Sequence, residues 1–396
     1  MLNRLISASL DHRWLTLSAL LVFVAVSGYI AVQIPVDAFP DLTNNQVVII
    51  TECPGLPPTE VEQLVTYPIE SAVMGLPRTE GVRSISKLGL SLVTVILEDG
   101  VPTYFARQIT NERLQEVRSR LPDGLQPTLG PVATAFGEVY QYTIEGSGQS
   151  LMERKTLQDW QIRNVLRTVP GVNEVNSWGG HTKQYTIEVD PLALQRYGLT
   201  LRDVFTRLSE NNRNFGGGFI EHAQQQYTIR GLGRAQGSND LERVVLVARN
   251  GVPVLVRDVA RVTIGSVPRQ GAVLRDGEGE TVSGMAIMLK GENGLRVIER
   301  VKERIGRLTL PNGVRLVPFY DQSEVINGTI RTVTHNLVEA GVLVILVLLV
   351  FLGNLRAALI VAAVIPLSMM FGFVGMAVFG ISANLMSLGE IGRAHV

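Results

Sequence analysis

Residues 14–34 read WLTLSALLVFVAVSGYIAVQI and contain no charged side chain. As a helix this stretch measures about 30 Å, which is enough to cross the hydrocarbon core of a membrane. The alternative is a cleaved signal peptide, since Arg4 and Arg13 supply a basic start. However, the apolar run is longer than a typical h-region, and no Ala-x-Ala-like cleavage site follows it. We therefore expect an uncleaved membrane anchor at residues 14–34.

Two further apolar blocks near the C-terminus predict membrane spans at 337–352 and 357–381. Only the turn Gly353–Arg356 separates them, so the two spans must be antiparallel neighbours. Pro366 is tolerable inside the third span, because neighbouring helices can satisfy the freed carbonyl. Glu339 could carry protons, but its place near the outer end of its span favours an interfacial carboxylate.

Basic residues predict the orientation. Arg4 and Arg13 precede the first span, and Arg356 lies between the second and third spans. Positively charged residues favour the cytoplasmic side, so we expect residues 1–13 and this turn to lie inside the cell. The long segment between the first and second spans then lies outside, in the periplasm if the cell has one.

Composition excludes several functions. Lys+Arg and Asp+Glu are equal at 36 each, which argues against nucleic-acid binding. Cys53 is the single cysteine, so the chain has neither a disulfide framework nor a multi-cysteine metal site. The sequence contains no P-loop, no dinucleotide-binding glycine motif, no zinc-protease motif and no nucleophile elbow. We therefore expect neither an enzyme nor a cofactor.

Strand-like and helix-like patterns alternate after the first span, in the order of a split βαβ module at 35–130. The apolar stripe of the first helix begins near Thr59, which we expect to be its N-cap. The predicted strands are 47–51, 82–88 and 90–97, and the predicted helices are 59–74 and 103–120.

A second copy of the module follows at 131–190 and resumes at 268–325, around an insertion at 191–267. Its predicted strands are 139–144, 172–178, 184–189, 281–289 and 314–320, and its predicted helices are 156–169 and 294–308. Within the insertion we expect a helix at 201–211 capped by Thr200, a glycine run at Gly216–Gly218 and a hairpin turning at Asn250–Gly251. The predicted fold is therefore an α+β membrane protein whose helices flank two split βαβ (ferredoxin-like) modules.

Candidate metal ligands are scattered. The histidines are far apart in sequence: His12, His181, His222, His335 and His395. Met285 and Met288 are three residues apart in a predicted strand, so their side chains face opposite sides. We interpret Met369, Met370 and Met376 as ordinary lipid-facing or packing residues of the third span, and Cys53 as a small buried side chain. No metal site can be predicted from this pattern.

Several stretches nevertheless resemble one family. Residues 37–41 read DAFPD directly after the first span, and Pro54–Gly55 is followed by TEVE at 59–62 and YPIE at 67–70. These stretches are similar to the periplasmic entry of resistance–nodulation–division (RND) transporters. The stretches YFARQ at 104–108, FLGNLR at 351–356 and SANLMSLG at 382–389 resemble its heavy-metal-efflux branch. The resemblance extends from residue 1 to residue 389.

The resemblance implies a homotrimer embedded in the lipid of the bacterial inner membrane, with a periplasmic adaptor protein and an outer-membrane channel as partners. It implies proton-driven export of metal cations, with details closer to the zinc/cobalt/cadmium type than to the copper/silver type. The two modules would be porter subdomains, and 191–267 would be a docking subdomain. The family's proton-relay and metal-binding regions lie beyond the matching part of the chain. No catalytic, cofactor or metal residue can therefore be carried over.

Residues 390–396 read EIGRAHV and depart from the family pattern, which continues there into an apolar, acid-bearing fourth span. They match the translation of a common sequencing adapter, so we expect a non-native tail; a frameshifted pseudogene is the alternative. A truncated pump would be inactive alone. A membrane-anchored sensor or scaffold and a multidrug-type RND exporter are the competing functions. The third span, which follows a tight turn, argues against a sensor or scaffold. The stretches at 104–108 and 351–356 argue against a multidrug-type exporter.

Overall fold

The computed structural model describes residues 9–39, 43–134, 136–249, 251–269, 271–384 and 386–387. The expected tail at 390–396, the end of the motif at 382–389 and residues 40–41 of the DAFPD motif lie outside these ranges. The chain forms two compact units. Unit 1 comprises residues 1–144, 162–177 and 283–396, and unit 2 comprises 145–161 and 178–282.

Three helical stretches of unit 1 are long and apolar enough to cross a membrane: Arg13–Gln33, Gln322–Phe351 and Leu355–Phe379. The first is helix α2 (Arg13–Gln33), close to the predicted 14–34. The second is part of α13 (Gln322–Leu352), which begins well before the predicted residue 337. The first half of α13 is mostly polar, so the apolar pattern that predicted the span did not include it. The Asp321 side chain caps it by accepting a hydrogen bond from Ser323 N at 2.9 Å.

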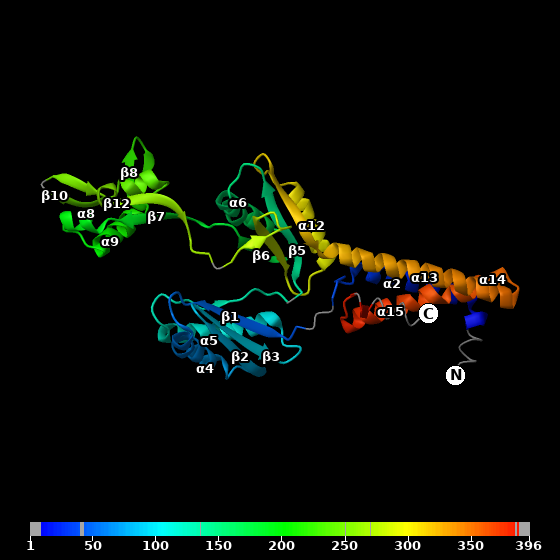
Figure 1. The fold of residues 1–396 in the computed structure, drawn as a ribbon. Helices are drawn as coiled ribbons and strands as arrows, with labels where there is room; N and C mark the ends of the chain where they lie inside the picture. Colours follow the sequence, from blue (N-terminus) through cyan, green and yellow to red (C-terminus); the bar gives the residue numbers. More distant parts are fainter. Residues whose placement is uncertain are drawn as a thin grey trace. The chain divides into compact units, whose positions relative to one another are not determined.

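The third stretch consists of α14 (Leu355–Ala362) and α15 (Val364–Phe379), which meet at Ala363. The interruption lies just before Pro366, whose nitrogen cannot donate a hydrogen bond to the Ala362 carbonyl. Helix α15 packs on α2, where the ring centroids of Phe23 and Phe371 are 4.2 Å apart (Figure 1). Most apolar side chains of these helices remain exposed, as for Val350 at 81%. Such surfaces need lipid or other protein to cover them.

The first module is a four-stranded antiparallel sheet in the order β2-β3-β1-β4. The strands are β1 (Gln46–Glu52), β2 (Thr79–Lys87), β3 (Leu90–Leu97) and β4 (Thr128–Leu129). The helical segments are α3 (Pro58–Val61), the π-helical turn η1 (Glu62–Thr66), α4 (Tyr67–Val73) and α5 (Thr103–Val117). The connection order is that of a split βαβ unit. One apolar core, which includes Ile49, Ile69 and Leu114, fills it.

Two local expectations for this module have different outcomes. Cys53 is fully buried in the core, as expected for a packing residue. The prediction that Thr59 caps the first helix is wrong. Helix α3 begins at Pro58, its N-cap is Pro57, and no side chain caps it. Proline is favoured in the first helical turn because it has no N–H to leave unpaired there, and this sets the start of the helix earlier.

The second sheet repeats the first strand by strand. Its path is β13-β14-β5-β15, and β6 also pairs with β14, so the core order is β6-β14-β5-β15. The strands are β5 (Glu138–Gly146), β6 (Val172–Gly179), β13 (Val273–Leu274), β14 (Glu280–Met288) and β15 (Val314–Asp321). The helical segments are α6 (Leu151–Leu157), η3 (Gln158–Ile162), α7 (Arg163–Leu166) and α12 (Gly294–Gly306). A π-helical turn again follows the first helical segment.

The insertion in unit 2 has its own small core, which includes Val204, Leu246 and Val256. Its stem is an antiparallel ladder between β7 (Lys183–Val189) and β12 (Ala260–Ser266). This pairing differs from the expected place of 184–189 in the second module. The ladder could not be seen in the sequence, because strand periodicity does not identify the partner.

The remaining elements of the insertion are α8 (Pro191–Arg196), α9 (Leu201–Asn211), α10 (Ser238–Glu242), α11 (Val256–Val259) and two hairpins. Thr200 caps α9 as predicted, in a reciprocal capping box with Asp203. The hairpin of β10 (Val245–Arg249) and β11 (Val252–Leu255) is the predicted one, although Asn250 in its turn lies outside the described residues. The hairpin of β8 (Phe215–His222) and β9 (Gln225–Gly231) was missed, since glycines at 216–218 indicate a loop.

Candidate functional site at the C-terminal ends of α2 and α15

Two segments that follow membrane helices lie side by side in unit 1. Val36 and Ala383 form a parallel bridge. Asp37 N donates to Ala383 O at 3.1 Å, and Ala383 N donates to Pro35 O at 2.9 Å. The two segments belong to the stretches DAFPD and SANLMSLG that carry the family resemblance. Their backbone pairing joins the C-terminal end of α2 to the C-terminal end of α15.

Helix α12 meets the same place from the second module. The Asp37 Oδ1 atom accepts a hydrogen bond from Gly294 N at 3.3 Å, in the first turn of α12. Arg296 Nη2 donates to Val32 O at 2.9 Å, in the last turn of α2. Both contacts satisfy backbone groups that helix ends leave unpaired. They also place negative charge at a helix start and positive charge at a helix end, which the helix dipoles favour.

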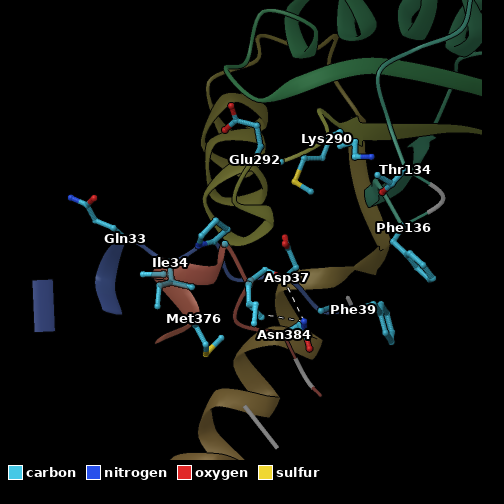
Figure 2. A pocket seen from close by; sticks show the side chains of 18 of the residues that line it. Gln33, Ile34, Asp37, Phe39, Thr134, Phe136, Lys290, Glu292, Met376 and Asn384 are labelled. Atoms are coloured by element: carbon cyan, nitrogen blue, oxygen red, sulfur yellow. Dashed lines mark hydrogen bonds between the residues drawn. The ribbon is translucent and has the colours of Figure 1, made fainter. Parts of the chain in front are cut away.

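A cavity of about 680 Å³ opens at this junction. Figure 2 shows its side chains, which come from the ends of α2 and α15, from the segment before β5 and from the residues after β14. One part of the lining is apolar, including Ile34, Phe39, Phe136 and Met376. The other part is polar, including Gln33, Asp37, Lys290, Glu292, Gln322 and Asn384. The rings of Phe39 and Phe136 contact each other at 5.7 Å between centroids.

The chemistry of this lining suits water and hydrated or amphipathic solutes. The charged residues of the lining are Asp37, Glu292 and Lys290. Among the residues that the structure describes, no group of three or more His, Cys, Asp or Glu side chains could hold a metal ion. A resident metal centre normally needs three or four such ligands. The described lining of the cavity therefore does not present the ligand set of a resident metal centre.

The histidines considered as ligands are not brought together. His222 is exposed in β8, and His335 lies in α13 at 4.0 Å from Glu339, with both side chains exposed. His181 is half-buried near Glu280. The hydrogen bond from Arg269 is the main cause that lowers the pKa of Glu280, and His181 contributes to a smaller degree. His395 lies outside the described residues.

The sulfur-containing residues separate into two groups. Met288 and Met376 line the junction cavity, whereas Met285 does not. Met369 and Met376 are both buried, so the packing role predicted for these two methionines of the third span is confirmed. Burial raises the pKa of the Cys53 thiol, which keeps it protonated and disfavours it as a ligand.

Sequence reasoning named Asp37 only as part of the DAFPD motif, and it did not single out Gly294 and Arg296. The available signal was topological. If the first and third spans both run outward, the segments that follow them emerge on the same side and can meet. The contribution of α12, more than 250 positions away from Asp37, had no such signal.

The fold and the junction together define a class: a protein with two split βαβ modules between apolar helices of membrane-spanning length. The sequence profile of the AcrB/AcrD/AcrF family matches residues 5–393. The chain therefore belongs to this family of RND proteins, and its relatives place it with the heavy-metal-efflux members.

Among its relatives, the "Cation efflux system protein CzcA" of Alcaligenes sp. (strain CT14) is 43% identical over 402 residues. "Protein HelA" of Legionella pneumophila is 46% identical over 400 residues. The "Cation efflux system protein CusA" of Escherichia coli (strain K12) is 39% identical over 399 residues. These matches cover 99%, 99% and 100% of this chain but only 38% of each relative.

Two crystal structures of a heavy metal efflux pump have the same fold. Their TM-scores are 0.87 and 0.89, with 36% and 38% sequence identity. They cover 97% and 98% of this chain, and this chain accounts for 39% of each of them. The chain thus corresponds to somewhat over a third of the length of its relatives.

Proposed function

We propose that this chain is the N-terminal part of an inner-membrane pump that exports heavy-metal cations from a bacterium, driven by proton influx. The observation that carries the proposal is the likeness to heavy-metal efflux pumps over nearly the whole chain, at 36% identity or more and a TM-score of 0.87 or more. The relatives are transporters, which agrees with the expectation that the chain is not an enzyme.

In this proposal α2, α13 and the α14–α15 pair cross the inner membrane, with residues 1–13 in the cytoplasm. Residues 35–130 and the split segment 131–190 plus 268–325 serve as periplasmic porter subdomains. Residues 191–267 form the docking subdomain, whose stem is the β7–β12 ladder. The exposed apolar surfaces of the long helices support membrane insertion, because water would not tolerate them.

For the cargo we favour zinc, cobalt and cadmium over copper and silver. A relative named "Cobalt-zinc-cadmium resistance protein CzcA", from Cupriavidus metallidurans, is 43% identical, whereas the Escherichia coli CusA protein is 39% identical. Multidrug-type export and a sensor or scaffold role are the alternatives. The relatives with metal-efflux names argue against both.

The hairpin β8–β9 supports the homotrimer in this proposal. Every residue of β8 is exposed, and the large side chains of Phe219 and Tyr227 are 56% and 53% exposed. A two-stranded hairpin is marginally stable without a surface to pack on. A second copy of the chain is the occupant that we propose for this surface. A periplasmic adaptor and an outer-membrane channel would complete the export path.

A chimeric pump tests the function. Residues 1–387 would replace the matching part of the Cupriavidus metallidurans CzcA protein, which supplies the remaining length. In an efflux-deficient bacterium we expect the chimera to raise tolerance to zinc, cobalt or cadmium, and the chain of 396 residues alone to give no tolerance. The proposal fails if the intact relative protects the cells from these metals and the chimera, although it is produced, does not. It also fails if the chimera protects the cells only against organic compounds.

The same chimera tests the trimer. Replacing residues 215–231 by a short Gly-Ser linker should leave the amount of membrane-inserted protein unchanged and convert the trimer to a monomer in native mass spectrometry. The control replaces residues 246–254 of the other hairpin, whose Leu246 and Val254 pack in the insertion's own core. The control should unfold the insertion. Retention of the trimer after loss of 215–231 would contradict the assignment.

A further inference from the structure

We propose that α12 is the element that receives movement from the membrane helices, through an outer joint made by residues 35–37, Ala383, Gly294 and Arg296. In this inference the joint stays closed while the pump works, and Asp37 is a positioning residue that holds α12 on it. The inference about transport rests on the proposed function, whereas the joint itself can be tested without it.

The segment 35–37 is bonded on both sides, which leaves it little freedom. Its backbone pairs with Ala383 through hydrogen bonds in both directions, at 3.1 and 2.9 Å. On its other side, the Asp37 carboxylate accepts the Gly294 N–H of α12 at 3.3 Å. A short segment fixed on two faces transmits displacement instead of absorbing it, because its backbone cannot turn without breaking these bonds.

The fit at the start of α12 is close. Gly294 is buried, and a Cβ atom placed on it would lie 3.1 Å from Asp37 Oδ1 and 3.6 Å from Val36 O. A second contact reinforces the first, since Arg296 Nη2 reaches Val32 O of α2 at 2.9 Å. The first turn of α12 is therefore held both to α2 and to the segment that follows it.

Helix α12 is also tied to α13, the second of the three apolar helices. Lys302 forms an ion pair with Asp321 and a hydrogen bond to Ser323 Oγ at 2.9 Å, both at the start of α13. The outer ends of α2, α13 and α15 are thus linked to one helix of the second module. That helix lies between β14 and β15 in the chain, and both strands belong to one sheet. Movement of α2 or α15 would reach this sheet through α12, whereas α13 follows β15 directly and is also joined to the sheet by the chain itself.

The first experiment measures the joint in the 396-residue chain in lipid nanodiscs. With Cys53→Ala as background, spin labels on cysteines introduced at Tyr29 of α2 and Glu299 of α12 report the distance distribution between the two helices by double electron–electron resonance. We expect one narrow distribution for the parent and for Asp37→Asn, which keeps an acceptor oxygen. The double variant Asp37→Ala/Arg296→Ala should broaden it at least about twofold in width.

Arg300→Ala is the matched control, because Arg300 lies one turn further along α12 and donates to Pro170 O instead of α2. It should leave the distribution narrow. The joint is refuted if the parent distribution is already broad, or if Asp37→Ala/Arg296→Ala leaves it as narrow as the parent. Circular dichroism of each variant separates loss of the joint from loss of folding.

The second experiment asks whether the joint stays closed during transport, in the chimeric pump. A disulfide between cysteines at Val36 and Ala383 should leave zinc export unchanged, whereas Asp37→Ala/Arg296→Ala should lower it about tenfold. Export that falls on oxidation and returns with reductant would show that the joint opens, and would overturn the inference. If the parent chimera exports nothing, the proposed function fails, and the spin-label distances still decide the joint.

Discussion

The two split βαβ modules have the same strand order but treat one connection in opposite ways. In the first module β2 and β3 are joined by the turn Leu88–Gly89. In the second, the equivalent strands β6 and β14 are separated by residues 180–279, which build the whole insertion. A hairpin end is where a chain can be lengthened without disturbing a sheet, because few contacts of the core cross it.

The chain is more closely packed where it leaves β6 for the insertion than at the equivalent turn of the first module. Gly89 and Gly179 both have left-handed backbones, with φ of +72° and +71°. A Cβ at position 89 would lie 3.6 Å from Cys53 O, an ordinary contact. At position 179 it would overlap the carbonyl oxygen of Thr281, where the end of β6 lies beside the start of β14. Glycine at position 89 therefore only relieves backbone strain, whereas glycine at position 179 is also needed because no Cβ fits there.

The largest expected effect is at this close contact between β6 and β14. Gly179→Ala should destabilise the second module by about 3 kcal/mol, because left-handed strain adds to overlap with a backbone atom. Gly89→Ala should cost only the strain, about 1–2 kcal/mol. Hydrogen-exchange mass spectrometry of the 396-residue chain would measure the opening free energy of each sheet. Equal losses of stability from Gly179→Ala and Gly89→Ala would show that β6 and β14 are not closely packed at Gly179.

A second test concerns the interior of the two sheets. Gly284 of β14 leaves no space for a Cβ beside the ring of Tyr142, which is fully buried. Gly284→Ala should therefore cost about 1–3 kcal/mol in the second sheet. Gly81→Ala in β2 is the matched control, since no atom lies within 4 Å of the added Cβ. Combining Gly284→Ala with Tyr142→Leu should recover part of the loss.

The first helices of the modules differ in their caps. Ser150 forms a capping box with Glu153 at the start of α6, whereas no side chain caps α3. Ser150→Ala should cost about 1 kcal/mol, and Thr59→Ala in the first module should cost less than about 0.5 kcal/mol. The same hydrogen-exchange measurement distinguishes them. A similar loss from Thr59→Ala would mean that Thr59 has a role at the helix start that its position in α3 does not show.

The cap also predicts a pH dependence. Hydrogen bonds from the backbone and side chain of Ser150 lower the pKa of Glu153. The ionised Glu153 carboxylate therefore stabilises the fold fully above the pKa that this group has in the unfolded chain. This stabilisation is lost as the pH falls through the lowered pKa of the folded state. Protection of α6 should decrease over this acidic range in the parent and stay level in Glu153→Gln, which has no carboxylate to titrate. No such difference between the two proteins would contradict the capping box.

The smallest effect is expected in the π-helical turns. Pro68 follows η1 and could be taken as its cause, but η3 occupies the equivalent place in the second module without a proline. We expect Pro68→Ala to retain the π turn and to lower stability by less than about 1 kcal/mol, through the greater freedom of the unfolded chain. Amide exchange across 62–66 would report the turn, and conversion to a regular helix would assign it to the proline after all.

Sequence periodicity located most elements of both modules, because their core faces follow regular two- and 3.6-residue spacing. The helix at 201–211 and the strand at 90–97 agree residue for residue with α9 and β3. It failed where the signal is polar or glycine-rich. The first half of α13 has only a few apolar residues among many polar ones, and β8 contains a run of glycines, so neither was predicted although their backbones are regular.

The sequence by itself determined the apolar spans, the repeated modules, the insertion and the family, since these depend on local pattern and on motifs that need no partner. The tertiary structure decided which strands pair and which distant groups meet. The stem of β7 with β12 and the joint between Asp37 and Gly294 both depend on contacts between segments far apart in the chain. Such contacts are chosen by the packing of the whole fold, and no local stretch of sequence specifies them.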